Sequence, residues 1–492
     1  MNPFIAGLKA SEMTFTANGA VTRKSTGSDV LNFFSRAGAM RGKFAEVTDL
    51  FVRAFAEDPR LAMRALFHLR DVRGGAGERD LFRFLLLQLV RVEYYMALEV
   101  LRHVPEYGRW DDLWELMDTD LRDAVVNLVD EQLYADVRAE SPSLLAKWMP
   151  SESASNAETK RYAAILRNEL HLSPREYRKV VSRLRKRLNV LERNLTASNY
   201  DGINYAHVPG QAMKKHGRKG KAFPRNDGER FGQFMAKVQR GEVAVKAGTL
   251  APHEVVRHYM ADGFSLRNLS LRTADPVIEA QWAQMVLDNA DGRNRLVVAD
   301  VSGSMFSGSA LSPILVSLSL SLLIASSNTG PFKDTFLTFS DKSEPQFVRG
   351  DTLLQKLRHI DYSNWGGSTN IQAAFDQILR IGVQHDLDPE DMPEMLIIVS
   401  DMQFNSCARV PNFDAAKAKF AVYGYDLPHI VFWNVNASVQ ESPVHLHEGN
   451  VSLVSGPSQN IYQSLLKGKL SSPYEFMLSV LNSERYSKIL PE

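Results

Sequence analysis

The stretch Leu296-Val297-Val298-Ala299-Asp300-Val301-Ser302-Gly303-Ser304 decides how the C-terminal part of this 492-residue chain folds. Its apolar run is short and β-branched, as in a buried strand, and it ends in polar residues. Similar runs and helical patterns alternate after it. The runs lie at 335–339, 395–399, 429–433 and 451–454, and the helical patterns at 309–327, 370–382, 412–422 and 458–466. We therefore expect a doubly wound α/β domain at residues 291–492, with a mostly parallel sheet covered on both faces.

Polar side chains follow the predicted strands at the edge where such a sheet binds ligands. Asp300-x-Ser302-x-Ser304 follows the first strand, Thr369 precedes a predicted helix, and Asp401 follows the strand at 395–399. Two carboxylates and three hydroxyls form an all-oxygen set that suits Mg²⁺ or another hard divalent cation. A lone Asp-x-Ser-x-Ser also occurs where these residues only cap a helix, but five residues in three suitable loops favour a metal site.

These five residues resemble the metal-ion-dependent adhesion site of von Willebrand factor A domains, a Rossmann-like fold. The resemblance implies that Asp300, Ser302 and Ser304 form the first metal loop, and that Thr369 and Asp401 form the second and third. Independently of the resemblance, neutral hydroxyls leave the ion incompletely neutralised, so an acidic residue of a partner protein could complete the metal shell.

The first 290 residues show helical periodicity almost throughout. Apolar stripes recur at 61–70, 80–100, 113–133, 144–149, 162–170 and 177–195. Ser173-Pro174 is a typical helix start, with a capping serine before a proline. We expect an all-α, HEAT-like arrangement of stacked helical pairs over residues 1–290.

Charge is divided unevenly along a chain whose formal net charge is only +1. Residues 292–492 carry 15 Lys and Arg against 20 Asp and Glu, so the excess of positive charge lies in the first part. Between Ser173 and Arg225 there are 14 basic and three acidic residues. Such clusters bind phosphates in a salt-dependent way. The candidate nucleic-acid-binding residues are Arg183, Arg185, Lys186, Arg187, Lys214, Lys215, Arg218, Lys219 and Lys221.

Two further expectations concern this basic region. Residues 210–221 contain almost no apolar residue and are expected to form a mobile loop. Five interleaved rings could stack on unpaired bases: Tyr200, Tyr205, His207, His216 and Phe223. The alternative is a solvated helix face followed by a floppy loop, and composition alone favours neither.

A helical-repeat part followed by a von Willebrand A domain resembles the Ro autoantigen family, whose first part is called the TROVE module. Residues 66–79, with the sequence LFHLRDVRGGAGER, resemble a motif of a bacterial, viral and plant branch of that architecture. The resemblance implies a ribonucleoprotein that binds small structured, non-coding or misfolded RNAs on a basic outer surface, and single-stranded RNA ends in a central hole. The helical part is shorter than in typical Ro proteins, so ring closure and individual RNA contacts do not carry over. The Gly74-Gly75 turn resembles a phosphate-binding loop only weakly, and a plain helix connection is favoured.

Several classes of protein are disfavoured. A single cysteine, Cys407, allows no intramolecular disulfide and no cysteine-based zinc site. The N-terminus lacks a signal-peptide pattern, and the apolar stretch 310–325 indicates a buried helix more than a membrane span, so we expect a cytoplasmic monomer. No histidine base accompanies Ser302 and Ser304, and no nucleotide-binding loop is present, so a non-enzymatic protein is expected. The favoured function is RNA binding, and the alternative is a metal-dependent protein-interaction adaptor that does not bind RNA.

Overall fold

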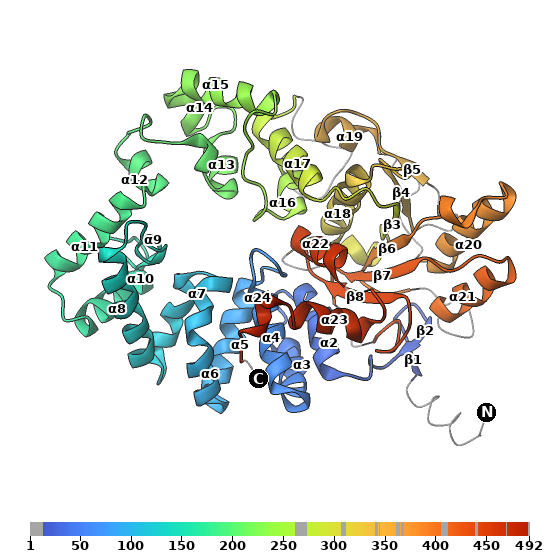
Figure 1. The fold of residues 1–492 in the computed structure, drawn as a ribbon, viewed down its shortest axis with the longest axis horizontal. Coiled ribbons are helices and arrows are strands. Elements are labelled where there is room, and N and C mark those ends of the chain that lie inside the picture. Colours follow the sequence, from blue (N-terminus) through green and yellow to red (C-terminus); the bar gives the residue numbers. More distant parts are fainter. Residues whose placement is uncertain are drawn as a thin grey trace.

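The computed structural model shows a ring in which helices form most of the circumference and one α/β unit completes it (Figure 1). The structure describes residues 13–260, 273–306, 311–339, 343, 345–360, 365, 369–404, 412–437, 441–468 and 470–490. The helices start beside the α/β unit, pass around the ring and return to it (Figure 1). Cys407 and the predicted loop residues 366–368 lie outside the described residues.

The helical part runs from Asp29 to Asp288, as the sequence predicts. Its helices are α2 (Asp29–Arg36), α3 (Phe44–Glu57), α4 (Pro59–Arg70), α5 (Arg79–Val92), α6 (Tyr94–Val100), α7 (Val104–Tyr107), α8 (Arg122–Arg138), α9 (Leu145–Trp148), α10 (Ala157–Glu169), α11 (Pro174–Arg187), α12 (Leu191–Thr196), α13 (Gly210–His216), α14 (Ala222–Asn226), α15 (Gly228–Gln239), α16 (Pro252–Val256) and α17 (Pro276–Asp288). Short 3-10 helices connect several of them, at Trp110–Asp118 and Arg257–Tyr259 among others.

Helix ends follow the local chemistry of the sequence. The predicted start at Ser173 is confirmed: its side chain accepts a hydrogen bond from the Glu176 N–H, and Glu176 binds back in a capping box. Three predicted helices were too long. The one at 80–100 is divided into α5 and α6 at Glu93. The one at 113–133 is divided between the 3-10 helix Trp110–Asp118 and α8, and the one at 177–195 breaks where Asn189 takes a left-handed conformation with φ of 46°.

The α/β unit contains a six-stranded sheet with strand order β5-β4-β3-β6-β7-β8. The strands are β3 (Arg295–Ala299), β4 (Thr335–Thr338), β5 (Pro345–Phe347), β6 (Met395–Ser400), β7 (His429–Asn434) and β8 (Val451–Ser455). Five of them are parallel, and β5 pairs antiparallel with β4 at the edge. The register pairs Ala299 with Val399, so β3 and β6 end side by side.

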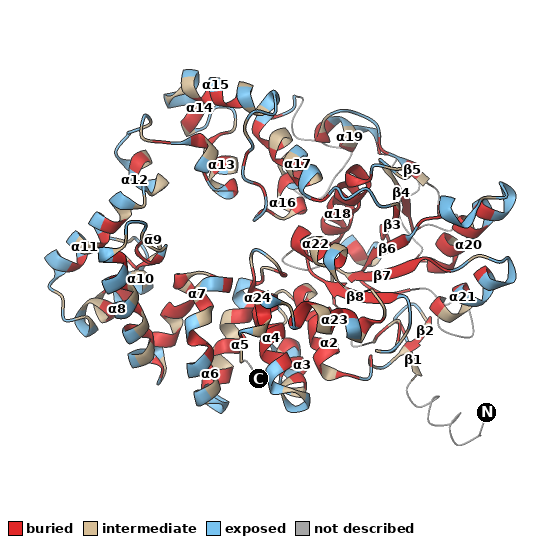
Figure 2. Cartoon of the chain, in the orientation of Figure 1, coloured by how far each residue is buried: buried red, intermediate tan, exposed pale blue. Residues whose placement is uncertain are grey.

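Helices cover both faces of this sheet, because alternate strand residues enter two different cores. Val297 and Ala299 belong to the large core that continues into the helical part, whereas Leu296 and Val298 belong to a smaller core. The helices of this unit are α18 (Pro313–Ser327), α19 (Leu353–His359), α20 (Ile371–Gln384), α21 (Asn412–Val422), α22 (Gln459–Lys467), α23 (Pro473–Leu481) and α24 (Glu484–Ser487). Figure 2 shows the central strands almost wholly buried. Every residue of α18 is buried, as predicted, and among the described residues no helix is long and apolar enough to span a membrane.

The ring is closed by contacts at both ends of the helical part. At one end α2 lies against β8, where a Cβ on Gly38 would approach the Ser455 carbonyl oxygen to 2.5 Å. The C-terminal helices also reach α4, where Arg64 donates to the Ile489 carbonyl oxygen. At the other end Glu279 of α17 accepts hydrogen bonds from the Leu353 and Leu354 N–H groups and so caps α19.

The turn at residues 70–79 forms part of this closure. A Cβ on Gly75 would lie 2.0 Å from the His68 carbonyl oxygen, so only glycine fits there. Asp71 is fully buried and bonds to Arg485 and Tyr486. The plain helix connection favoured by the sequence is therefore confirmed, and its glycine is needed for packing.

The sequence did not predict a small hairpin near the N-terminus. Its strands are β1 (Met13–Phe15) and β2 (Val21–Arg23), and they pair antiparallel. Thr16 donates a hydrogen bond to the Phe404 carbonyl oxygen at 2.5 Å, and Arg23 pairs with Ser442. The first described residues therefore lie against the α/β unit.

Candidate metal centre and nucleic-acid interface

Asp300 lies at the carboxyl end of β3, beside the end of β6, and is fully buried. Its Oδ1 accepts a hydrogen bond from the Ser302 N–H at 2.9 Å, and its Oδ2 accepts one from the Ser400 hydroxyl at 2.5 Å. These bonds fix the carboxylate at the edge of the sheet. Burial, together with the nearby charge of Asp401, raises the pKa of Asp300 to about 6.

Asp401 follows β6 and is 1% exposed. Burial raises the pKa of this carboxyl, and hydrogen bonds from the Ser304 side chain and the Gln403 N–H act in the opposite direction. Ser304 also lies 3.2 Å, hydroxyl to hydroxyl, from Ser302. Four of the five predicted metal ligands are thus joined in one hydrogen-bonded group at the ends of β3 and β6.

Thr369, the fifth predicted ligand, is buried two residues before α20. No group of three or more His, Cys, Asp and Glu side chains that could hold a metal occurs in the described part of the chain. The donor set at Asp300 is different in kind, since two carboxylates are supplemented by hydroxyls. Two buried carboxylates in electrostatic contact leave negative charge that a divalent cation would neutralise, so these residues fit Mg²⁺.

A cavity of about 1540 Å³ opens inside the ring. Its lining comes from opposite sides of the circumference, including Arg41 after α2, Trp148 of α9, Lys214 of α13 and Leu311 of the α/β unit. Nine lysines and arginines line it against three glutamates, counted over the described residues. The basic residues are Arg41, Lys147, Arg178, Arg185, Arg193, Lys214, Lys215, Arg218 and Arg257.

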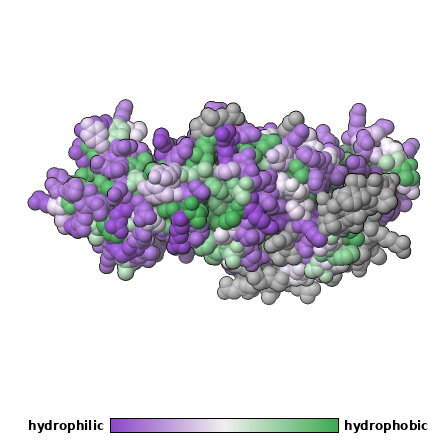
Figure 3. All heavy atoms as spheres, turned by 90° about the horizontal axis from the view of Figure 1, so that it is seen from below, coloured by the Kyte–Doolittle hydropathy of each residue, from purple (hydrophilic) through white to green (hydrophobic). Residues whose placement is uncertain are grey.

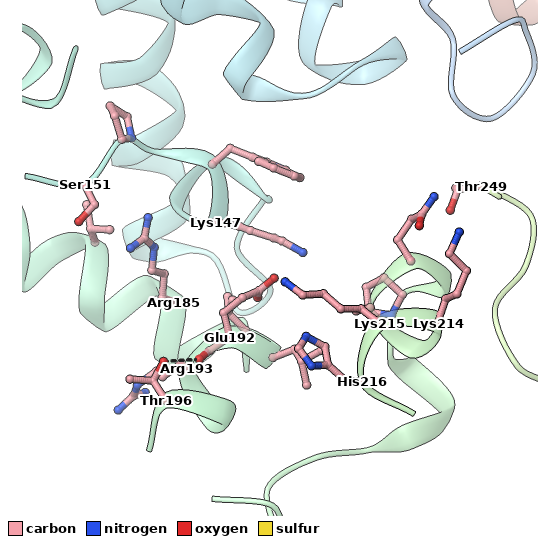
Figure 4. A pocket seen from close by; sticks show the side chains of 18 of the residues that line it. Lys147, Ser151, Arg185, Glu192, Arg193, Thr196, Lys214, Lys215, His216 and Thr249 are labelled. Atoms are coloured by element: carbon pink, nitrogen blue, oxygen red, sulfur yellow. Dashed lines mark hydrogen bonds between the residues drawn. The ribbon is translucent and has the colours of Figure 1, made fainter. Parts of the chain in front are cut away.

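Figure 4 shows part of this cavity from close by. The side chains of Lys147 and Lys215 extend from two different helices toward Glu192, and Lys214 points toward Thr249 (Figure 4). Arg185 is held by the Ala146 and Met149 carbonyl oxygens, both at 2.8 Å. The cavity wall is therefore positively charged on more than one side.

The predicted nucleic-acid-binding residues fall into three groups. Four of them line the cavity: Arg185, Lys214, Lys215 and Arg218. Four others are exposed outside that lining: Arg183, Lys186, Lys219 and Lys221. Arg187 is engaged within the protein, because its guanidinium donates to carbonyl oxygens at the end of α8, including those of Asp136 and Val137 at 3.1 Å.

Two expectations for the basic region were wrong. Residues 210–221 are not a loop throughout: Gly210–His216 forms α13, anchored by the fully buried Met213. Tyr205 and Phe223 cannot stack on bases, because both are buried in a separate small core. Their rings pack against each other at 5.0 Å, centroid to centroid. Of the other three predicted rings, only that of His216 lines the cavity.

The structure also brings in residues that the sequence analysis did not select. Trp148 is half-buried in the cavity wall, and Arg109 lies over its ring at 4.3 Å from the centroid. Arg41, Arg193, Arg257, His253 and His258 also line the cavity. No local sequence pattern identifies these residues, because they come together only when the ring closes.

Two protein-family models match the chain. A model described as "Domain of unknown function (DUF2828)" matches residues 16–143 and 131–292. The chain belongs to the DUF2828 family. In this DUF2828 protein a second model, "Domain of unknown function (DUF7788)", matches residues 294–486, which contain the sheet.

Two individual proteins are similar to this DUF2828 chain. "Uncharacterized protein L728" of Acanthamoeba polyphaga mimivirus is 28% identical over 518 residues, covering 96% of this chain and 87% of the viral protein. The crystal structure of the Deinococcus radiodurans RO (RSR) protein aligns over 92% of this chain and 95% of that one, with 16% identity and a TM-score of 0.38. The predicted order, a helical part followed by an α/β domain, is confirmed by the fold itself.

Proposed function

We propose that this protein is a non-enzymatic RNA-binding protein whose ring cavity holds single-stranded RNA. The observation that supports this most is the lining of the cavity, with nine basic side chains against three acidic ones among the described residues. Such an excess attracts a polyanion and binds it through phosphate contacts and counterion release.

The size of the cavity favours a polymer over a small metabolite. At about 1540 Å³ it exceeds the roughly 300–1,000 Å³ of ordinary small-molecule pockets. Its basic residues come from both sides of the opening, so successive phosphates of one strand could each meet a cation. A duplex would present its phosphates on a much wider body, so we infer that the strand is single.

Trp148 supplies the second interaction that single strands require. Its ring is half-buried in the cavity wall, with one face covered by Arg109. The Lys147 ammonium also lies 5.4 Å from the centroid of this ring, and a base that stacks on Trp148 would gain contact without any choice of sequence. The combination of phosphate-binding cations and an aromatic platform is typical of proteins that bind single strands.

The outer surface is proposed as the place for structured RNA. Arg183, Lys186, Lys219 and Lys221 are exposed and lie outside the cavity lining. Figure 3, which views the ring edge-on, shows largely hydrophilic side chains with smaller hydrophobic patches between them. Exposed cations of this kind would bind duplex phosphates by charge.

We further propose that Asp300, Ser302, Ser304, Thr369 and Asp401 hold Mg²⁺ and form a docking site. Hydroxyl ligands are neutral, so the ion would keep an open position for a carboxylate of a partner protein. The alternative function, an adaptor that does not bind RNA, rests on this group of residues alone. It differs from the main proposal because it assigns no role to the cavity.

Binding of a fluorescent single-stranded oligouridine, measured by anisotropy over a series of salt concentrations, tests the main proposal. We expect tight binding that weakens steeply with salt, and weak competition from a duplex of the same length. Failure to bind the oligonucleotide at low salt would leave only the adaptor function. A pull-down of acidic proteins that EDTA abolishes would then be its expected signature.

A further inference from the structure

One corner of the cavity brings three cations and two histidines together. We call it the α13–α16 corner and define it by Lys214, Arg218, His253, Arg257 and His258, all of which line the cavity. The Lys214 ammonium donates to the Glu254 carbonyl oxygen at 3.2 Å, which joins α13 to α16. Arg218 lies 2.6 Å from the Nδ1 of His258, which joins the end of α13 to the 3-10 helix Arg257–Tyr259.

Glu254, an acidic residue of the cavity lining next to Lys214, is hydrogen-bonded by neutral donors. Both oxygens of the Glu254 carboxylate accept hydrogen bonds from the Gln211 amide, at 2.8 and 2.9 Å, and one also accepts from the Ala251 N–H. Among the described residues no carboxylate forms an ion pair with Lys214, Arg218 or Arg257. The corner therefore lines the cavity with three cations against one carboxylate, that of Glu254.

Two polar atoms in the corner are buried without a partner in the described part of the chain. They are the Nε of Arg218 and the Nδ1 of His253. His253 is 6% exposed and borders the cavity, so its unpartnered nitrogen is enclosed and not solvated. A buried polar atom that lacks a partner costs free energy, which a bound ligand would recover.

His258 holds Arg218 in place. A guanidinium has only donors, so the Nδ1 of His258 accepts from Arg218, and the His258 proton lies on Nε2. That nitrogen is 4.0 Å from the Asp275 carboxylate, which caps α17. Arg218 is thus oriented by a chain of contacts that ends on a rigid helix, and its remaining nitrogens stay available.

We propose that the α13–α16 corner binds a terminal phosphate of the RNA, a phosphomonoester, in preference to a phosphodiester within the strand. This inference rests on the proposed function of the cavity. A phosphomonoester carries close to two negative charges and three free oxygens. Lysine offers three donors and arginine a planar fork of them, so Lys214, Arg218 and Arg257 match three oxygens better than the two of a diester.

The test compares one short oligouridine in four forms: 3′-hydroxyl, 3′-phosphate, 5′-hydroxyl and 5′-phosphate. Anisotropy at constant ionic strength gives the Kd of each. We expect one phosphorylated end to bind about ten-fold more tightly than its hydroxyl counterpart, which is the effect of one added charge-assisted contact. The Arg218→Gln protein should bind both forms of that end within about two-fold of each other.

Arg193→Gln is the matched control, because Arg193 lines the cavity but lies outside the corner. It should weaken all four forms alike. Circular dichroism shows that the Arg218→Gln protein is folded. If the wild-type protein binds all four forms equally, this inference is overturned and the proposed function stands. If none of the four forms binds, both this inference and the proposed function are contradicted.

A competition with uridine monophosphate distinguishes an RNA end from a free nucleotide. The phosphorylated oligonucleotide should compete far better than the mononucleotide, because only it also reaches Trp148 and the cations outside the corner. Equal competition by the two would show that the corner binds a mononucleotide, and would overturn the inference of an RNA end.

Discussion

Asp71 and Arg485 are 414 residues apart in the chain and form a two-point ion pair where the ring closes. The Asp71 carboxylate is fully buried and also accepts a hydrogen bond from the Tyr486 hydroxyl at 2.8 Å. The Arg485 guanidinium keeps the pKa of Asp71 below its usual range, although burial acts in the other direction. This pair joins the turn after α4 to the last helices of the chain.

Removal of Arg485 should therefore destabilise the whole ring. Arg485→Ala leaves a buried carboxylate without its cation, which costs about 3 kcal/mol when one partner of a buried pair is lost. Urea denaturation would measure this. Lys488→Ala is the control, because Lys488 pairs with Glu106 on the surface and should cost less than about 1 kcal/mol. Equal losses from the two variants would contradict the proposed role of the pair.

His68 gives the stability of the protein a predictable dependence on pH. It is buried beside Phe34 and Tyr486, and burial lowers its pKa to about 4. In the unfolded chain the pKa returns to 6.5, so between pH 6.5 and 4 the unfolded state binds more protons. The free energy of unfolding should fall as the pH falls through this range, by on the order of 3 kcal/mol for this one group.

The variant His68→Gln tests this, since glutamine does not titrate. Chemical denaturation at pH 7 and pH 5 should show a smaller difference in the free energy of unfolding than in the wild type. His171→Gln is the control, because His171 is exposed and should leave the difference unchanged. An unaltered difference in the His68 variant would show that other groups carry the pH dependence.

Trp148 should contribute to RNA affinity through stacking. Base stacking on an aromatic residue contributes about 1–3 kcal/mol per base. Trp148→Ala should therefore weaken oligouridine binding about ten-fold or more, and Trp148→Phe should retain most of the affinity. Tyr95→Ala provides a comparison, because Tyr95 is 83% exposed on α6, outside the cavity lining, and its loss should have no effect.

Magnesium should stabilise the folded protein through the buried carboxylates at the end of the sheet. Addition of Mg²⁺ should raise the Tm of the wild type, because a ligand that binds only the native state stabilises it. Asp401→Asn should abolish this increase. The exposed Asp120→Asn should not. A Tm that Mg²⁺ raises equally in all three proteins would place the effect elsewhere.

Much of the α/β unit could be predicted from the sequence because its signals are local. A buried parallel strand needs a continuous apolar run, and Leu296–Ala299 and Met395–Val399 both contain one. Asp300 directly follows the first run and Asp401 lies two residues after the second, so both could be placed together at the edge of the sheet before any coordinates. β5 was not predicted, because an edge strand of three residues has no continuous apolar run.

The cavity could not be predicted because it depends on closure of the ring. Arg183 and Arg185 are two residues apart on α11, yet the first is exposed and the second lines the cavity. Arg41 and Arg257 lie far apart in the sequence and line the same space. Composition identifies a basic region, but only the path of the chain decides which of its cations meet inside.

The difference between cations inside the cavity and exposed cations allows a direct test of the proposal that RNA binds in the cavity. The double variant Arg193→Gln/Lys215→Gln neutralises two cavity cations, and Arg183→Gln/Lys186→Gln neutralises two exposed cations outside the cavity lining. Kd for a single-stranded oligouridine would be measured for both at several salt concentrations. We expect at least about ten-fold weaker binding and a shallower salt dependence for the cavity variant, with little change for the other. Equal affinity of the two variants would contradict the proposal.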